Sequence, residues 1–149
     1  MLTIHRILHP TDFSASSDAA LRLAAVLAKD HDAQIILLHV IEPPPVGSSG
    51  AVPAPPPGLP PSRAEVQQHL AQLAATLPEL RTECRVIEEV SAADAILDVA
   101  RETGCDVIVM GTHGRSGLAR LLMGSVAEQV VRRATCPVLT VKSPDAGLR

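Results

Sequence analysis

The sequence predicts an α/β fold, with an open parallel sheet of five strands and helices on both faces. Short apolar runs alternate along the chain with amphipathic stretches of helical period. The apolar runs do not alternate with polar residues, which is typical of strands buried on both faces. The chain has 149 residues, 46% of them hydrophobic, which suffices for one core and hardly for two. We therefore expect residues 1–149 to form a single domain.

The first three elements are a strand, a helix and a strand. Residues 4–9 are rich in Ile and Leu and are followed by Pro10, so a buried strand is expected there. A helix is expected over residues 14–30, with serines at its start to cap it. Residues 33–41 form the second apolar run and the second expected strand.

A proline-rich segment interrupts this alternation over residues 43–61. Nine of the 13 prolines fall in it, mixed with glycines. Proline excludes both a helix and a central strand. The low-complexity composition favours a disordered or loosely ordered loop over a functional lid.

Regular structure resumes at Ser62, which stands three residues before Glu65 as in a capping box. The helix that follows is expected to continue until Pro78, and a third strand to cover residues 84–90. Ser91 opens the next helix in the same way.

Gly104 is placed to end that helix. A fourth strand is expected over residues 106–110, followed by a glycine-rich loop over residues 111–124. Ser125 and Glu128 have the spacing of a further capping box, and residues 136–142 form the last strand.

Composition and charge exclude several classes of function. The net charge is −3, and Phe13 is the only aromatic residue, which argues against nucleic-acid partners. No apolar run approaches a membrane span, and the N-terminus lacks the apolar region of a signal peptide, so a soluble, cytoplasmic protein is expected. The three cysteines are interpreted as small buried apolar residues, because their spacing fits neither a disulfide framework nor a zinc site.

The glycine-rich loop carries the strongest functional signal. Gly111, Gly114 and Gly124 would let backbone N–H groups approach an oxyanion, and Ser125 adds a hydroxyl at a helix N-terminus. Arg115 adds a cation nearby. Taken singly, each glycine reads as a turn residue and Ser125 as a plain N-cap. Together they favour a polyphosphate site.

The spacing of this set resembles the ATP-binding branch of the universal stress protein family. The pattern is a glycine, two residues, a glycine, nine residues, then glycine and serine. The resemblance extends over nearly the whole chain outside the proline-rich segment, through residues 7–14, 37–40, 108–111 and 136–141. It implies a Rossmann-like fold of the adenine nucleotide alpha hydrolase type, with strand order 3-2-1-4-5.

The resemblance also implies ATP as the ligand and places its parts. Adenine and ribose would lie against Pro10, Thr11, Asp12, Val40, Met110 and Gly111; the phosphates would lie on Gly111, Gly114, Gly124, Ser125 and Val126. No acidic residue lies in the glycine loop, so Mg²⁺ or Mn²⁺ would be held mainly by phosphate oxygens and water. The family further implies a homodimer through the last strand, residues 136–142, which we expect at a sheet edge. A monomer with a shielded edge is the alternative.

Motifs of other nucleotide-binding and signalling folds are incomplete in this sequence. No lysine stands where a Walker A motif needs one, and no dinucleotide fingerprint follows the first strand. Asp12 and Lys142 have counterparts in a receiver domain, but the third strand ends in Glu88 and Glu89 where that site needs an aspartate.

Three histidines have side chains that could bind a metal or transfer a proton. His113 is interpreted as a solvated loop residue, and His9 and His39 as satisfied core or rim histidines.

We expect a nucleotide-dependent stress-response or signalling module, not an enzyme, with no catalytic residue and no metal-ligating side chains. One alternative is a nucleotide hydrolase or phosphotransferase with slow turnover, acting through His113, Asp12 or Ser125. Another is a protein that binds no nucleotide and works through its dimer surface.

Overall fold

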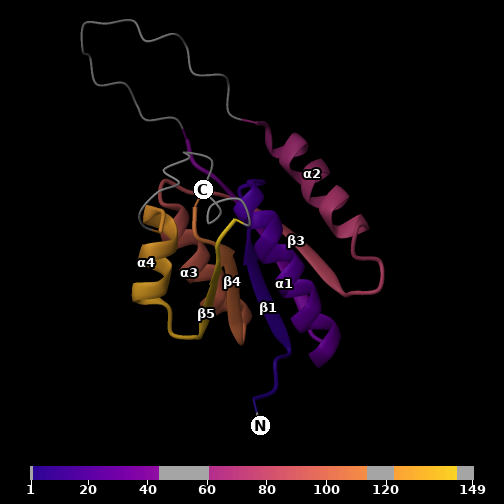
Figure 1. The fold of residues 1–149 in the computed structure, drawn as a ribbon. Coiled ribbons are helices and arrows are strands. Elements are labelled where there is room, and N and C mark those ends of the chain that lie inside the picture. Colours follow the sequence, from indigo (N-terminus) through magenta and orange to yellow (C-terminus); the bar gives the residue numbers. More distant parts are fainter. Residues whose placement is uncertain (1, 44–60, 114–122, 144–149) are drawn as a thin grey trace, which may run out of the picture.

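A five-stranded parallel sheet with helices on both faces forms the framework of the protein (Figure 1). The computed structural model describes residues 2–43, 61–113 and 123–143. The strand order is β3-β2-β1-β4-β5, and every neighbouring pair is parallel. The predicted fold class and strand order are confirmed. In chain order the elements are β1 (Arg6–Pro10), α1 (Ala15–His31), β2 (Gln34–Ile41), α2 (Arg63–Ala75), β3 (Thr82–Glu88), α3 (Ala92–Thr103), β4 (Val107–Gly111), α4 (Ser125–Arg133) and β5 (Val138–Val141).

Two layers of helix bury the two faces of the sheet. Helices α1 and α2 pack on one face, and α3 and α4 on the other (Figure 1). Successive residues of one strand enter opposite layers: Ile35 and Leu37 pack under α1 and α2, whereas Ile36 and Leu38 pack under α3 and α4. Both faces therefore need apolar side chains, which explains the continuous apolar runs.

The predicted helix ends are largely confirmed. The side chain of Ser14 accepts a hydrogen bond from the Ser17 N–H, and Ser91 caps α3 in the same way through the Asp94 N–H. Ser62 and Glu65 form the full capping box of α2. Gly104 ends α3 in the left-handed conformation, with φ 59°.

Strand boundaries differ from the predicted ones by a few residues. Pro10 is the last residue of β1 and does not break it, because the ladder continues from the Thr11 N–H to the Leu38 carbonyl at 2.8 Å. Strand β3 begins and ends two residues earlier than expected; it has a neighbour on one side only, so its polar residues Thr82 and Glu83 are tolerated there. Strand β5 is shorter than expected but lies at the predicted edge.

The start of α4 contradicts the predicted capping box. Gly124 is the N-cap, its carbonyl accepts from the Glu128 N–H at 3.0 Å, and no side chain caps the helix. Ser125 is instead the first helical residue. The chain enters the helix one residue early because the Gly124 N–H is held by the Thr112 carbonyl at 2.6 Å, which fixes Gly124 at the turn.

The prediction for the cysteines is wrong for one of them. Cys105 is buried and Cys136 half-buried, but Cys84 is exposed, because it lies on the edge strand β3. Residues 44–60 of the expected proline-rich loop fall outside the described ranges. Within those ranges no helix is long and apolar enough to cross a membrane.

Candidate functional site

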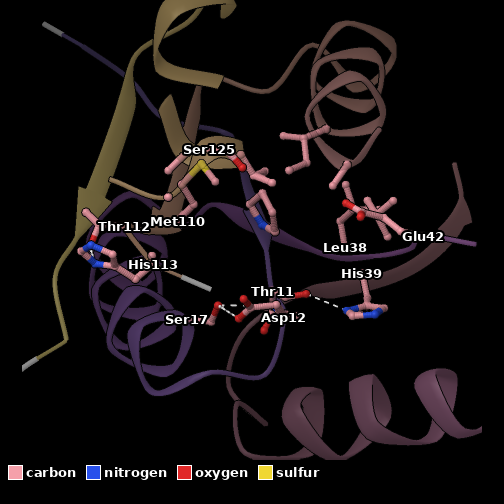
Figure 2. A pocket seen from close by; sticks show the side chains of 18 residues that line it. Thr11, Asp12, Ser17, Leu38, His39, Glu42, Met110, Thr112, His113 and Ser125 are labelled. Carbon is pink, nitrogen blue, oxygen red and sulfur yellow. Dashed lines mark hydrogen bonds between the residues drawn. The ribbon is translucent and has the colours of Figure 1, made fainter. Parts of the chain in front are cut away.

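A cavity of about 330 Å³ opens at the carboxyl ends of β1, β2 and β4 (Figure 2). This is the end of a doubly wound sheet at which ligands bind. The first residues of α3 and α4 complete its wall. Its size is that of a small-molecule pocket.

The predicted site residues that the structure describes all line this one cavity. They are Pro10, Thr11, Asp12, Val40, Met110, Gly111, Gly124, Ser125 and Val126. Gly114 and Arg115 lie outside the described residues. The sequence thus predicted which residues lie together, and their role in binding stays a prediction.

The turn after β1 is held by hydrogen bonds and presents a carboxylate. Oδ1 of Asp12 accepts hydrogen bonds from the Ser14 N–H at 3.0 Å and from the Ser17 hydroxyl at 2.8 Å. Among the described residues, none donates to Oδ2 of Asp12. The carboxylate is therefore fixed by one oxygen, while the other remains available at the cavity (Figure 2).

An aromatic stack supports this turn from the side of α2. Phe13 adopts a left-handed backbone conformation, with φ 63°, and its ring lies between two imidazoles. Its centroid is 3.8 Å from that of His69 in α2 and 4.9 Å from that of His39 in β2. Nδ1 of His39 in turn donates to the Thr11 carbonyl at 2.8 Å. The stack therefore connects α2 and β2 to the acidic turn.

The end of β4 lies tightly against the start of α1. Gly111 packs on Ser16, leaving no space for a side chain. The Ser16 hydroxyl donates to the Val141 carbonyl at 3.0 Å, and the Thr112 N–H donates to the same carbonyl at 3.0 Å. These contacts join α1, β4 and β5 directly beneath the cavity.

His113 forms part of the cavity wall and is not a solvated loop residue. Its Nδ1 lies 2.9 Å from the Thr112 hydroxyl, and its carbonyl accepts from the Ser14 hydroxyl at 3.4 Å. Nε2 of His113 is buried and has no hydrogen-bond partner among the described residues. The expectation of a solvated side chain is wrong because these contacts draw the residue onto α1.

The first turn of α4 brings uncapped main-chain amides to the cavity. Gly124, Ser125 and Val126 line it. The Gly124 N–H is bound by the Thr112 carbonyl, but no described side chain caps the N–H groups of the turn that follows. The positive end of the helix dipole points in the same direction. Such a helix start attracts anions.

Half of the lining lies outside the predicted binding residues, although the sequence already pointed to His113 as a catalytic alternative. The additional residues are Ser17, Leu38, His39, Glu42, Ala92, Ile96, Thr112, His113 and Ala127. Most adjoin a predicted residue in the sequence, so widening each predicted segment by a residue or two would have found them. Ile96 lies one turn into α3, and only the packing of α3 on the sheet brings it here.

His9 lies next to the site but not in it. It is fully buried, its Nδ1 donates to the Val109 carbonyl at 2.8 Å, and its Nε2 has no partner. It is a core histidine as predicted, but only one of its two ring nitrogens has a hydrogen-bond partner among the described residues. Burial lowers the pKa of His9 to about 4, so the imidazole is neutral near pH 7. Within the described ranges no three of His, Cys, Asp and Glu gather as a metal site would require.

Comparison with known proteins places the chain in a family. The model of the universal stress protein family matches residues 3–142. The chain belongs to the universal stress protein family. It is 35% identical to universal stress protein MJ0531 of Methanocaldococcus jannaschii over 93% of this chain and 82% of that protein.

Solved structures of the same family share the fold. Universal stress protein UspA from Lactobacillus plantarum superimposes with a TM-score of 0.71 at 27% identity, covering 93% of this chain and 98% of that one. A universal stress protein solved in complex with cAMP gives a TM-score of 0.67 at 26% identity, covering 95% and 98%.

Proposed function

We propose that this universal stress protein binds ATP in the cavity at the carboxyl ends of β1, β2 and β4. The observation that carries the proposal is that Gly111 at the end of β4 and the uncapped first turn of α4 open onto one cavity. Backbone donors and a positive helix end suit phosphate oxygens. The glycine pattern typical of the ATP-binding members of the family supports ATP in particular.

The remaining lining suits a nucleoside. Leu38, Val40 and Met110 offer apolar contact to a base, and Oδ2 of Asp12 offers an acceptor to an amine or a ribose hydroxyl. The absence of a carboxylate cluster among the described residues leaves a Mg²⁺ ion to be held mainly by the phosphates and water. The relative solved with cAMP supports adenine nucleotides as the ligand class.

We assign the protein a binding role, not an enzymatic one, as a nucleotide-dependent stress-response module. Asp12 lies in the turn after β1, where the Ser14 N–H and the Ser17 hydroxyl hold one of its oxygens, which suits it to accept a hydrogen bond from a ligand. A homodimer through β5 is part of the proposal. It is supported by the position of this strand at the edge of the described sheet and by Leu139, which is 40% exposed.

A slow nucleotide hydrolase is the second candidate. The presence of His113 in the cavity lining favours it, because a neutral imidazole there could accept a proton from an attacking water. Multiple-turnover phosphate release that is lost in His113→Ala would support this candidate. Phosphate release no faster than the uncatalysed background in either protein would leave the binding role.

Calorimetric titration with ATP and Mg²⁺, with cAMP and AMP in parallel, tests the binding proposal. Gly124→Val should abolish ATP binding while the fold is kept, since the backbone φ of Gly124, −56°, is open to any residue and the new side chain enters the cavity lining. Ser125→Ala should weaken binding by roughly tenfold through loss of one hydroxyl.

The control for Ser125→Ala is Ser62→Ala, which removes a serine hydroxyl at the start of α2, outside the cavity. It should bind as the wild type does. Folded wild-type protein that binds no adenine nucleotide at millimolar concentration would overturn the proposal, as would wild-type affinity in Gly124→Val. Tighter binding of cAMP than of ATP would replace ATP by cAMP as the proposed ligand.

A further inference from the structure

Two of the three cysteines meet at the end of the sheet opposite the cavity. Cys105 follows the cap of α3 and precedes β4, and Cys136 lies between α4 and β5. Although 31 residues separate them, their Sγ atoms are 3.9 Å apart. A disulfide needs about 2 Å between the sulfurs, so an approach of about 2 Å would bring them to bonding distance.

Both residues occupy connecting segments, which can make such a shift more easily than strands. Each stands just before a strand, and the two strands pair in parallel from Ile108 and Val138 onward. The sulfurs thus face each other across neighbouring connections of one sheet. No other cysteine competes within the chain, because Cys84 lies on β3, at the far edge of the sheet from β5.

The two thiols differ in their surroundings. Cys105 is 7% exposed and packs in the α3–α4 layer, where burial raises the pKa of its thiol well above the usual range. Cys136 is half-buried and packs at the edge of the same layer. A small oxidant would therefore reach Cys136 first, with Cys105 waiting behind it as a protonated thiol.

We propose that Cys105 and Cys136 are a thiol pair that a peroxide converts into an intrachain disulfide. In the first step the Cys136 sulfur attacks the peroxide, the O–O bond breaks, and Cys136 becomes a sulfenic acid as water or an alcohol leaves. In the second step the Cys105 sulfur attacks the Cys136 sulfur, the S–O bond breaks, and the hydroxyl leaves as water with the Cys105 proton. Both thiols are oxidised and one peroxide is reduced.

The disulfide would enclose β4, the glycine loop and α4 in one covalent ring. Its expected effect is on stability, because the ring restricts the unfolded chain. The cavity lies beyond the other ends of β4 and β5, so nucleotide affinity should not change. Pairing of β5 in a dimer would engage main-chain groups at its edge, whereas the Cys136 sulfur faces Cys105 within the layer.

The test uses the full chain with Cys84→Ala, so that no exposed thiol forms intermolecular bonds. After treatment with equimolar hydrogen peroxide, free thiols are counted by alkylation under denaturing conditions, and the mass is measured. We expect both remaining thiols to be lost together, the mass to fall by two hydrogen atoms, and a cross-linked peptide to join Cys105 to Cys136. The melting temperature should rise by roughly 5–10 °C and return on addition of dithiothreitol.

Two further variants, each carrying Cys84→Ala, separate the steps. With Cys105→Ala, Cys136 should accumulate as a sulfenic acid that dimedone traps. With Cys136→Ala, Cys105 should remain a thiol under the same treatment. Unchanged thiols in the Cys84→Ala protein would overturn the proposal, as would peroxide oxidation of Cys136 to sulfinic acid while Cys105 stays free.

Discussion

Gly111 at the end of β4 lies so close to Ser16 of α1 that a Cβ at Gly111 would overlap the Ser16 hydroxyl oxygen and stand 2.8 Å from the Ser16 carbonyl carbon. The carbonyl carbon belongs to the main chain, which cannot rotate away as a side chain can. Glycine at this position is therefore required by packing, whatever the ligand.

Gly111→Ala should destabilise the protein by about 1–3 kcal/mol, because α1 and β4 must separate to admit the methyl group. Unfolding in guanidinium chloride measures the loss. The matched variant Gly104→Ala has no atom within 4 Å of its new Cβ and carries only the strain of a left-handed φ, about 1 kcal/mol. Equal stability of Gly111→Ala and the wild type would contradict the close packing.

The helix starts predict a contrast among three serines. Ser62→Ala and Ser91→Ala should each cost about 1 kcal/mol, since each side chain accepts from a first-turn N–H. Ser125→Ala should leave the stability of the free protein nearly unchanged, because Gly124 is the N-cap of α4. Thermal and chemical unfolding of the three variants checks this order. If Ser125→Ala lowered the free energy of unfolding by about 1 kcal/mol, the result would support Ser125 as the N-cap, as the sequence predicted.

Because His9 is buried and neutral, we expect the free energy of unfolding to fall on mild acidification. Its pKa is about 4 in the folded protein against 6.5 in the unfolded chain. The unfolded chain therefore binds the proton first, and stability falls as the pH drops from 6.5 to 4, by about 3 kcal/mol in total. Unfolding free energies measured between pH 7.5 and 4.5 test this.

His9→Gln serves as the comparison, since an amide can still donate to the Val109 carbonyl but does not titrate. Its stability should change less over the same range. Below pH 4.5, carboxylates with lowered pKa values, such as that of Asp106 beside the His5 and Arg6 N–H groups, add their own losses. Parallel pH profiles of the two proteins between pH 6.5 and 4.5 would refute the role of His9.

The stack of Phe13 on His69 predicts a measurable coupling. A double-mutant cycle of Phe13→Leu and His69→Ala should give an interaction free energy of about 0.5–1.5 kcal/mol in denaturant unfolding. The cycle of Phe13→Leu with His5→Ala should give none, because His5 lies at the other end of the sheet, before β1. Additive effects in the first cycle would show that the rings touch without stabilising each other.

The edge strand predicts the oligomeric state. Leu139→Asp places a charge on β5 and should convert a dimer into a monomer in sedimentation velocity. Val26→Asp is the control, since Val26 is also exposed, at 56%, but lies on α1. A dimer that survives Leu139→Asp, or a wild type that is monomeric at high concentration, would exclude pairing through this strand.

The sequence predicts the fold well because the decisive signals are local. Apolar runs mark strands covered on both faces, and Ser62 with Glu65 marks a helix start by spacing alone. The choice between Gly124 and Ser125 as N-cap was not predictable in this way. Both residues suit the position, and the hydrogen bond from the Gly124 N–H to the Thr112 carbonyl decides between them.

Contacts between distant segments account for the remaining errors in the site. His113 is drawn to the cavity wall by α1, about a hundred residues away in the chain, and no local pattern reports that contact. Cys105 and Cys136 meet only because β4 and β5 are neighbours. The strand order came from the family resemblance, since the alternation of runs alone does not specify which strands adjoin.

The start of α4 differs from that of α2 in a way that time-resolved labelling could follow. In α2 the Ser62 side chain accepts from the Glu65 N–H, and the Glu65 side chain accepts from the Ser62 N–H. Helix α4 instead begins after Gly124, which has no side chain to accept such a hydrogen bond. In the absence of an anion its opening turn should fray, and its amide hydrogens should exchange with deuterated solvent sooner than those of α2. The same local weakness would make the order of this turn report occupancy of the cavity, because a bound anion would slow the exchange of its amide hydrogens.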